Sequence, residues 1–151
     1  MKQLYLITTF LLLHNVVLAQ DSLEIKDQNT LRYMNDSTEN RISVGCGWAG
    51  IPTSNIYIIR DLISEERFDL IGKLLDSNTP STQYLAAVSL LRANKKSGFF
   101  LDSSTLQKIS ILQQSEEVIY FCSGCTRRWS NSLKSLLDKK SKDYMTKWTK
   151  H

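Results

Sequence analysis

The central part of the chain repeats apolar residues at intervals of three and four positions, the spacing of one face of an α-helix. Two short segments of this kind follow one another between Thr53 and Asn78. Their apolar residues at helical spacing are Ile56, Ile59, Ile63, Phe68, Ile71, Leu74 and Leu75. Because Thr53 and Ser54 are residue types that cap helix starts, we expect a pair of short helices in this region.

The strongest helix prediction covers the segment that begins at Thr79 and Pro80. Thr79 is a good capping residue, and proline at the first helical position loses no hydrogen bond, since that N–H has no partner in a helix. Basic Lys95 and Lys96, followed by Gly98, are typical of a helix end. The apolar residues of this segment are Tyr84, Leu85, Ala87, Val88 and Leu91.

One further helical segment follows Asp102, with Leu106, Ile109 and Leu112 at helical spacing, and then the pattern becomes extended. Residues 118–121 are β-branched or aromatic and too few for a helix, so they predict a short strand. A short helix is expected at Asn131–Leu137. The sequence therefore predicts a mainly α protein with four to five short helices and one short extended segment near the C-terminus.

The first 19 residues have the pattern of a secretory signal peptide. Lys2 gives a positive start, an apolar stretch follows, and Val17 and Ala19 are small enough for the signal-peptidase subsites. A transmembrane anchor is the weaker interpretation, because polar residues 14–15 interrupt an apolar run that would need about 20 residues to cross a bilayer. We therefore expect cleavage after Ala19, no remaining membrane span, and a periplasmic or secreted protein.

The expected mature chain divides into three parts. Residues 20–44 are polar and show no sustained period, so they predict a mobile N-terminal arm that docking on the body could order in part. Residues 45–137 hold the predicted helices and form the helical domain. This domain starts with a glycine-rich loop, in which Trp48 and Ile51 are expected to pack into the core. Residues 138–151 form a basic C-terminal tail.

Composition mainly excludes classes of function. The chain has 151 residues, 19 Lys and Arg against 15 Asp and Glu, and 42% apolar residues, which suits one small globular domain. Its two histidines are His14, inside the expected leader, and His151. Catalytic triads, Cys-His dyads and histidine zinc sites need internal histidines. We therefore expect no cofactor and no metal, and a protein that is not an enzyme.

The helical block resembles HEAT and armadillo repeats. The resemblance lies in residues 74–88, where the sequence Leu-Leu-Asp-Ser-Asn-Thr-Pro-Ser-Thr-Gln-Tyr-Leu-Ala-Ala-Val is similar to the turn and second helix of such a repeat. Residues 45–137 also resemble a group of small secreted bacterial proteins of unassigned function. These share a Cys-Gly loop, a similar helical block and a C-terminal Cys-Ser-Gly-Cys-Thr segment. The resemblance implies HEAT-like helix packing and no particular activity.

Three cysteines, Cys46, Cys122 and Cys125, are candidate disulfide or redox residues. In an oxidising compartment one pair is expected, with one thiol left over. A bond from Cys46 to Cys122 or Cys125 would contribute about 4.5 kcal/mol, against about 2 kcal/mol for Cys122–Cys125, so we favour a structural bond from Cys46. The alternative is a redox-active Cys122-Ser-Gly-Cys125 motif, in which a following helix would lower the thiol pKa. A metal site is disfavoured because three thiolates lack the usual fourth ligand.

The segment from Thr126 to the C-terminus contains eight basic and two acidic residues. Its candidate basic surface consists of Arg127, Arg128, Lys139, Lys140 and Lys142. One interpretation is adhesion to an anionic partner; the other, which we favour, is a solvated helix whose Tyr144 and Trp148 pack on the body.

Taken together, these patterns favour an exported, non-enzymatic module that binds a protein or a component of the cell envelope. Nucleic acid is not an expected partner of an exported protein. A small thiol–disulfide protein acting through Cys122 and Cys125 is the alternative. The sequence does not indicate the partner or the oligomeric state.

Overall fold

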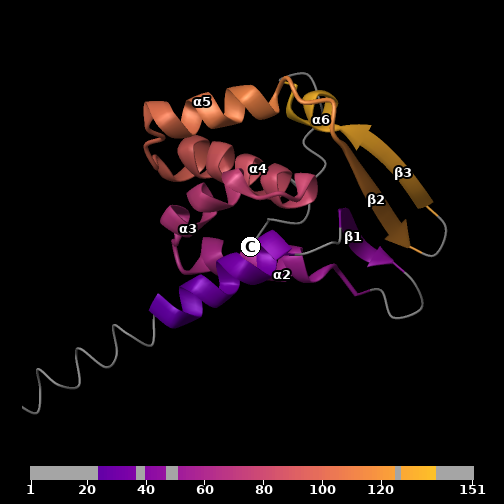
Figure 1. The fold of residues 1–151 in the computed structure, drawn as a ribbon, viewed down its shortest axis with the longest axis horizontal. Helices are drawn as coiled ribbons and strands as arrows, with labels where there is room; N and C mark the ends of the chain where they lie inside the picture. The colour runs from indigo at the N-terminus through magenta and orange to yellow at the C-terminus, as the bar shows by residue number, and fades with distance from the viewer. Residues whose placement is uncertain (1–23, 37–39, 47–50, 125–126, 139–151) are drawn as a thin grey trace, which may run out of the picture.

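The computed structural model describes residues 24–36, 40–46, 51–124 and 127–138, which form a stack of helices beside a small sheet (Figure 1). The helices are the segment 24–36, α2 (Ser54–Ser64), α3 (Phe68–Lys73), the 3-10 turn η1 (Leu74–Asp76), α4 (Pro80–Ser97), α5 (Ser103–Leu112) and α6 (Leu133–Leu137). The strands are β1 (Arg41–Cys46), β2 (Val118–Gly124) and β3 (Arg127–Ser132). Within these described ranges, no helix has the length and apolar character needed to cross a membrane.

The strands form one mixed sheet, and this finding corrects the predicted fold class. β2 lies in the centre, parallel to β1 and antiparallel to β3. The protein is therefore built from helices and a sheet together, so the prediction of a mainly α fold with HEAT-like packing and one extended segment is wrong. The physical reason is that one face of β2 is buried against the helices, and a strand held there needs neighbouring strands to satisfy its backbone hydrogen bonds.

The predicted central helices are confirmed. α4 has proline in its first turn and ends at Gly98, whose φ of 69° is the left-handed conformation that glycine adopts easily. The side chain of Asp102 caps α5 by accepting a hydrogen bond from the Thr105 N–H at 2.6 Å. The Thr79 side chain makes no such bond to α4; instead the side chain of Asn40 accepts from the Ser81 N–H at 3.1 Å.

Residues 24–36 and 41–44 of the predicted arm pack on the body, as a helix and part of a strand that the sequence pattern did not predict. Residues 24–36 form a helix in which Met34 is fully buried, and residues 41–44 belong to β1. Asp27 of this helix accepts two hydrogen bonds from Arg67, at 3.0 and 2.5 Å. Leu31 and Met34 are the apolar residues of this helix that pack on the core, and ion pairs add further contacts, so its sequence shows no sustained apolar stripe.

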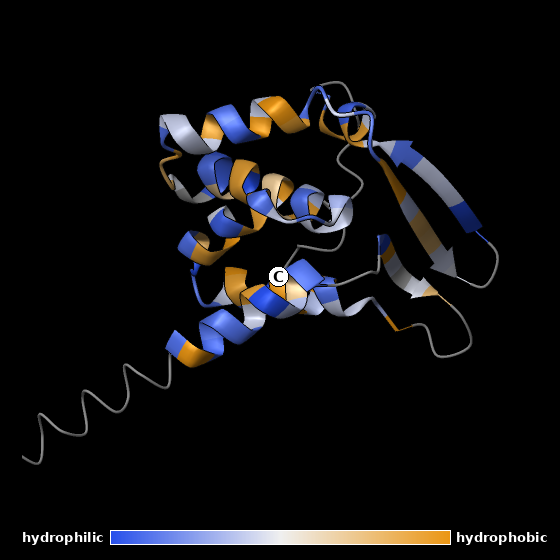
Figure 2. Ribbon diagram, viewed as in Figure 1, coloured by the Kyte–Doolittle hydropathy of each residue, from blue (hydrophilic) through white to orange (hydrophobic). Residues whose placement is uncertain are grey.

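The core lies between the helices and the inner face of the sheet. The Phe121 ring of β2 meets Tyr84 of α4 edge-on, with ring centres 6.2 Å apart, and stacks on Trp129 of β3 at 5.5 Å. Figure 2 shows the apolar segments along α4, α5 and β2 that supply this core. Ile51, predicted to pack into the core, is exposed, and Trp48 lies outside the described residues.

Candidate functional site: the outer face of the sheet

The strands place alternate side chains on opposite faces of the sheet. In β2, Ile119 and Phe121 are buried against the helices, so Val118 and Tyr120 project from the other face. Tyr120 is 58% exposed, which is unusual for a large aromatic residue on the central strand of a sheet. This exposed aromatic residue marks a surface that the helices do not cover.

Pairing between strands shows which side chains surround Tyr120. Arg41 of β1 and Ser130 of β3 lie directly opposite it. Arg128 precedes Ser130 by two positions on β3 and therefore lies on the same face, diagonal to Tyr120. We call Arg41, Val118, Tyr120, Arg128 and Ser130 the outer sheet face.

The strands carry three arginines and no acidic residue. Arg127 and Arg128 are exposed, and no carboxylate among the described residues forms an ion pair with either. Figure 2 shows the end of β3 that carries them as strongly hydrophilic. The sheet therefore presents positive charge that its own strands do not neutralise.

Several basic residues of the helical part, in contrast, have acidic partners. Arg67 contacts both Asp27 and Asp69, and these hydrogen bonds raise the pKa of Arg67. The hydrogen bond from Arg67 is also the main reason that the pKa of Asp69 is lowered. Among the described residues, the other pairs between different parts of the fold are Lys26–Glu65, Lys108–Asp76 and Lys134–Glu116. These cations serve contacts within the fold, whereas the exposed arginines of β3 do not.

Only part of the predicted basic surface lies within the described residues. Arg127 and Arg128 lie on β3, and the prediction of a helix from Asn131 is corrected because β3 continues to Ser132. The remaining members, Lys139, Lys140 and Lys142, lie outside the described residues, as do Tyr144 and Trp148. Arg41 was not predicted as part of the surface, although the alternation of polar and apolar residues in Arg-Ile-Ser-Val could have indicated a strand there.

A disulfide between Cys46 and Cys122 joins β1 to β2, with 5.8 Å between the two Cα atoms. It is one of the two bonds from Cys46 that the sequence favoured. The pairing of β1 with β2 shifts between Val44 and Cys46, so Gly45, with φ of 85°, is an extra residue in β1. This bulge moves Cys46 to the face that Cys122 occupies, because a shift of one residue exchanges the two faces of a strand.

The structure gives the redox alternative no physical support. Cys122 is bonded to Cys46 and only 7% exposed, and Cys125 lies outside the described residues. The segment that follows the motif is strand β3, so the helix N-terminus that would lower a thiol pKa is missing from its expected place. Among the described residues, no group of three or more His, Cys, Asp or Glu could hold a metal ion.

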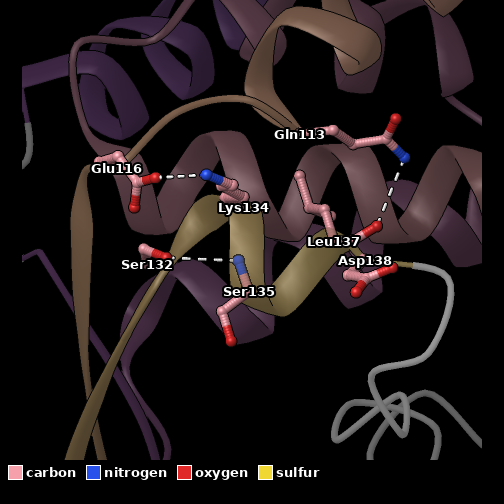
Figure 3. Close-up of a pocket in the computed structure, with 7 residues that line it drawn as sticks. All are labelled: Gln113, Glu116, Ser132, Lys134, Ser135, Leu137 and Asp138. Atoms are coloured by element: carbon pink, nitrogen blue, oxygen red, sulfur yellow. Dashed lines mark hydrogen bonds and ion pairs between the residues drawn. The ribbon is translucent and has the colours of Figure 1, made fainter.

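A pocket of about 600 Å³ lies where α5 meets α6 (Figure 3). Lys134 donates to Glu116 at 2.7 Å, which raises the pKa of Lys134. The Gln113 amide donates to the Leu137 carbonyl at 3.4 Å. These groups bind one another across the junction of the two helices, so they explain how α6 is held rather than what the pocket could bind.

A second pocket, of about 380 Å³, lies between α3, the end of α4 and the start of α5. Phe68 and Phe99 contact each other in it, with ring centres 4.6 Å apart, and Phe100 at its rim is 83% exposed. Its charged lining includes the Lys108–Asp76 pair and Asp102, which caps α5. Apart from the capping residue Asp102, Lys73 is the one charged residue of the lining without an ion pair among the described residues, and a single surface lysine does not define a ligand.

Comparisons with protein-family models, with curated proteins and with solved structures find no match to this chain. The resemblance to HEAT-like repeats and to small secreted proteins therefore stays a prediction. The outer sheet face, where exposed Arg128 lies near exposed Tyr120, forms the candidate functional site together with the neighbouring Arg127 of β3.

Proposed function

We propose that this protein is an exported, non-enzymatic module that binds an acidic segment of another protein at its sheet. The observation that carries the proposal is the pair of exposed arginines, Arg127 and Arg128, which have no acidic partner among the described residues and lie on a sheet that also exposes Tyr120. The guanidinium group binds carboxylates through two parallel hydrogen bonds. Arginine and tyrosine are also enriched at the centres of protein interfaces.

A protein partner is favoured over a lipid or a simple polyanion because the site combines charge with apolar area. Val118 and Tyr120 project from the same face as Arg128. A polyanion would use the arginines alone, whereas a polypeptide can also cover the tyrosine ring and the valine. The excess of basic residues from Thr126 to the C-terminus would attract the same acidic partner.

Export is supported by two features of the chain. The first 19 residues have the signal-peptide pattern, although they lie outside the described residues. The Cys46–Cys122 disulfide is typical of proteins that fold in oxidising compartments. Peptide mapping of the protein recovered from cells, without reduction, would show whether the mature chain begins after Ala19.

The binding proposal can be tested with a fluorescein-labelled decapeptide that has a central Glu-Glu pair flanked by Val and Thr. Anisotropy titration should show binding that weakens as salt is raised, because the contacts are charged and exposed. The double variant Arg127→Glu, Arg128→Glu should weaken binding at least tenfold. A matched control is Lys95→Glu, Lys96→Glu, which changes the net charge equally at the end of α4 remote from the sheet and should leave the affinity within about twofold.

Folding of each variant is checked by circular dichroism and thermal unfolding, since exposed substitutions should change stability little. Equal weakening by the two double variants would show that only total charge matters and would overturn the assignment of the site. Binding to phosphatidylglycerol vesicles but not to the acidic peptide would overturn the choice of a protein partner.

A further inference from the structure

We infer that the acidic segment binds as a fourth strand, added along the free edge of β3; this inference rests on the proposed function and specifies how the partner is held. β3 pairs with β2 on one side, and no other described strand pairs with its second side. Figure 1 shows β3 at the margin of the molecule, away from the stack of helices. An edge strand of this kind offers backbone groups to an incoming extended chain.

The pairing of β2 with β3 identifies which backbone groups point outward. The Leu133 N–H donates to the Glu117 carbonyl at 2.9 Å, which makes this pair a hydrogen-bonded one. Hydrogen-bonded and non-hydrogen-bonded pairs alternate along an antiparallel ladder, and the register from Val118 to Ser123 is continuous. The N–H and C=O groups of Arg128 and Ser130 therefore point away from β2, toward the free edge.

The side chains at this edge explain why the added strand should be acidic. Arg127 and Arg128 are neighbours along β3, so they project from opposite faces of the sheet. Two consecutive acidic residues in an added strand would also project from opposite faces. Each carboxylate could then lie beside one guanidinium, at the distance of a cross-strand pair. The geometry thus points to an extended segment with adjacent acidic residues.

Charge also separates this partner from a second copy of the chain. Pairing of two β3 edges would bring a second Arg127 and a second Arg128 to the same seam, and like charges oppose such pairing. Charged residues on edge strands are a common protection against edge-to-edge association. An acidic strand removes this obstacle because it neutralises the two arginines.

The direct test is amide hydrogen exchange by NMR on the full protein, with and without the Glu-Glu decapeptide. The amides of Arg128 and Ser130 should exchange fast in the free protein and at least tenfold more slowly at saturation. The amides of Trp129 and Asn131 already bond to β2 and serve as internal controls that should change little.

A second test uses proline, which edge strands tolerate where the N–H faces solvent. Ser130→Pro removes one outward N–H and should weaken peptide binding at least tenfold, whereas Ser130→Ala should leave it within about twofold. If Ser130→Pro does not fold, N-methylating alternate amides of the peptide removes instead the hydrogen bonds that the peptide N–H groups donate to the outward carbonyls of Arg128 and Ser130. N-methylation should weaken binding to the unchanged protein by the same factor.

The outcomes separate this inference from the proposed function. Peptide binding that depends on Arg127 and Arg128 but slows no edge amide would keep the proposed function and overturn strand addition. Slowed exchange of Arg128 and Ser130 that appears with rising protein concentration, without peptide, would assign the edge to a second copy and overturn the inference. If the unchanged protein does not bind the peptide at all, both the proposed function and strand addition are overturned.

Discussion

At the scale of single residues, two tyrosines show how position decides the role of a side chain. Tyr84 is 1% exposed on α4, where its ring meets Phe121 of the sheet. Tyr120 lies one residue before Phe121 and therefore on the opposite face, where it is exposed. Burial of an aromatic ring contributes a few kcal/mol of stability, whereas an exposed ring is free for contact with a partner.

Tyr84→Ala should lower the free energy of unfolding by about 2–5 kcal/mol, because it leaves a cavity between α4 and the sheet. Tyr120→Ala is the matched control and should change stability by less than about 0.5 kcal/mol. Urea unfolding followed by circular dichroism measures both. A loss below about 1 kcal/mol for Tyr84→Ala would mean that α4 does not pack on the sheet as described.

Asp102 makes part of the stability dependent on pH. Its pKa is lowered, mainly by the hydrogen bond from the Thr105 N–H at the start of α5. The folded state favours the charged carboxylate, so the contribution of Asp102 to stability is fully present above its usual pKa of 3.8. This contribution is lost as the pH falls through the lowered pKa of Asp102 in the folded state. Asp102→Ala should therefore be less stable than wild type at pH 7, and the difference should shrink in strong acid.

Asp102→Asn is the control for that titration, since asparagine caps a helix without a charge. The stability of Asp102→Asn should therefore not show the pH dependence that the Asp102 carboxylate causes. Thermal unfolding from pH 2 to pH 7 measures all three proteins. A difference between wild type and Asp102→Ala that stays constant over this range would show that the carboxylate does not cap α5.

At the scale of elements, the bulge in β1 is the feature on which the disulfide depends. Gly45 has a φ of 85°, where other residues are strained, and it shifts Cys46 to the face of Cys122. A second glycine, Gly72 of α3, is a contrast, because a Cβ there would meet open space in ordinary helical backbone.

Gly45→Ala should lower the free energy of unfolding by about 1–2 kcal/mol, since alanine resists a positive φ. Gly72→Ala should instead raise it by about 0.4–1 kcal/mol, because alanine favours the helix and restricts the unfolded chain. Chemical unfolding of the oxidised proteins tests the pair. Two changes of the same sign would show that the two glycines do not differ as the backbone indicates.

Sequence patterns predict the elements whose packing is apolar and miss those held by polar contacts. α2 to α5 and β2 carry apolar residues at regular spacing, and their approximate positions could be predicted. β3 has one apolar residue, Trp129, and forms because the chain turns back at Gly124, with φ of 64°, and pairs with β2. Such pairing depends on contacts between segments, which local spacing does not contain.

The candidate site could be predicted only in part, for a similar reason. Arg127 and Arg128 stood out as basic residues, and Cys46 as a disulfide partner. Arg41 and Tyr120 did not, because they meet only through the parallel pairing of β1 and β2, nearly 80 positions apart in the chain. The exposure of Tyr120 also depends on which face of β2 the helices cover.

At the scale of the whole molecule, the disulfide links positions 76 residues apart and encloses most of the helices. Because the bond restricts the unfolded chain, it contributes up to about 4.5 kcal/mol to the free energy of unfolding. In the double variant Cys46→Ser, Cys122→Ser, the free energy of unfolding should fall by a large part of this amount. Cys125→Ser keeps the bond and should unfold like wild type, so an equal loss in that control would contradict the Cys46–Cys122 pairing.

The most direct test of the central claim is an NMR map of backbone chemical shifts during titration with the Glu-Glu decapeptide. If the sheet is the binding site, the largest changes should cluster at Arg127–Ser130 and at the neighbouring Val118–Tyr120, and the peptide with Lys-Lys in place of Glu-Glu should cause none. Changes centred on the pocket between α5 and α6, or around Phe100, would contradict the account.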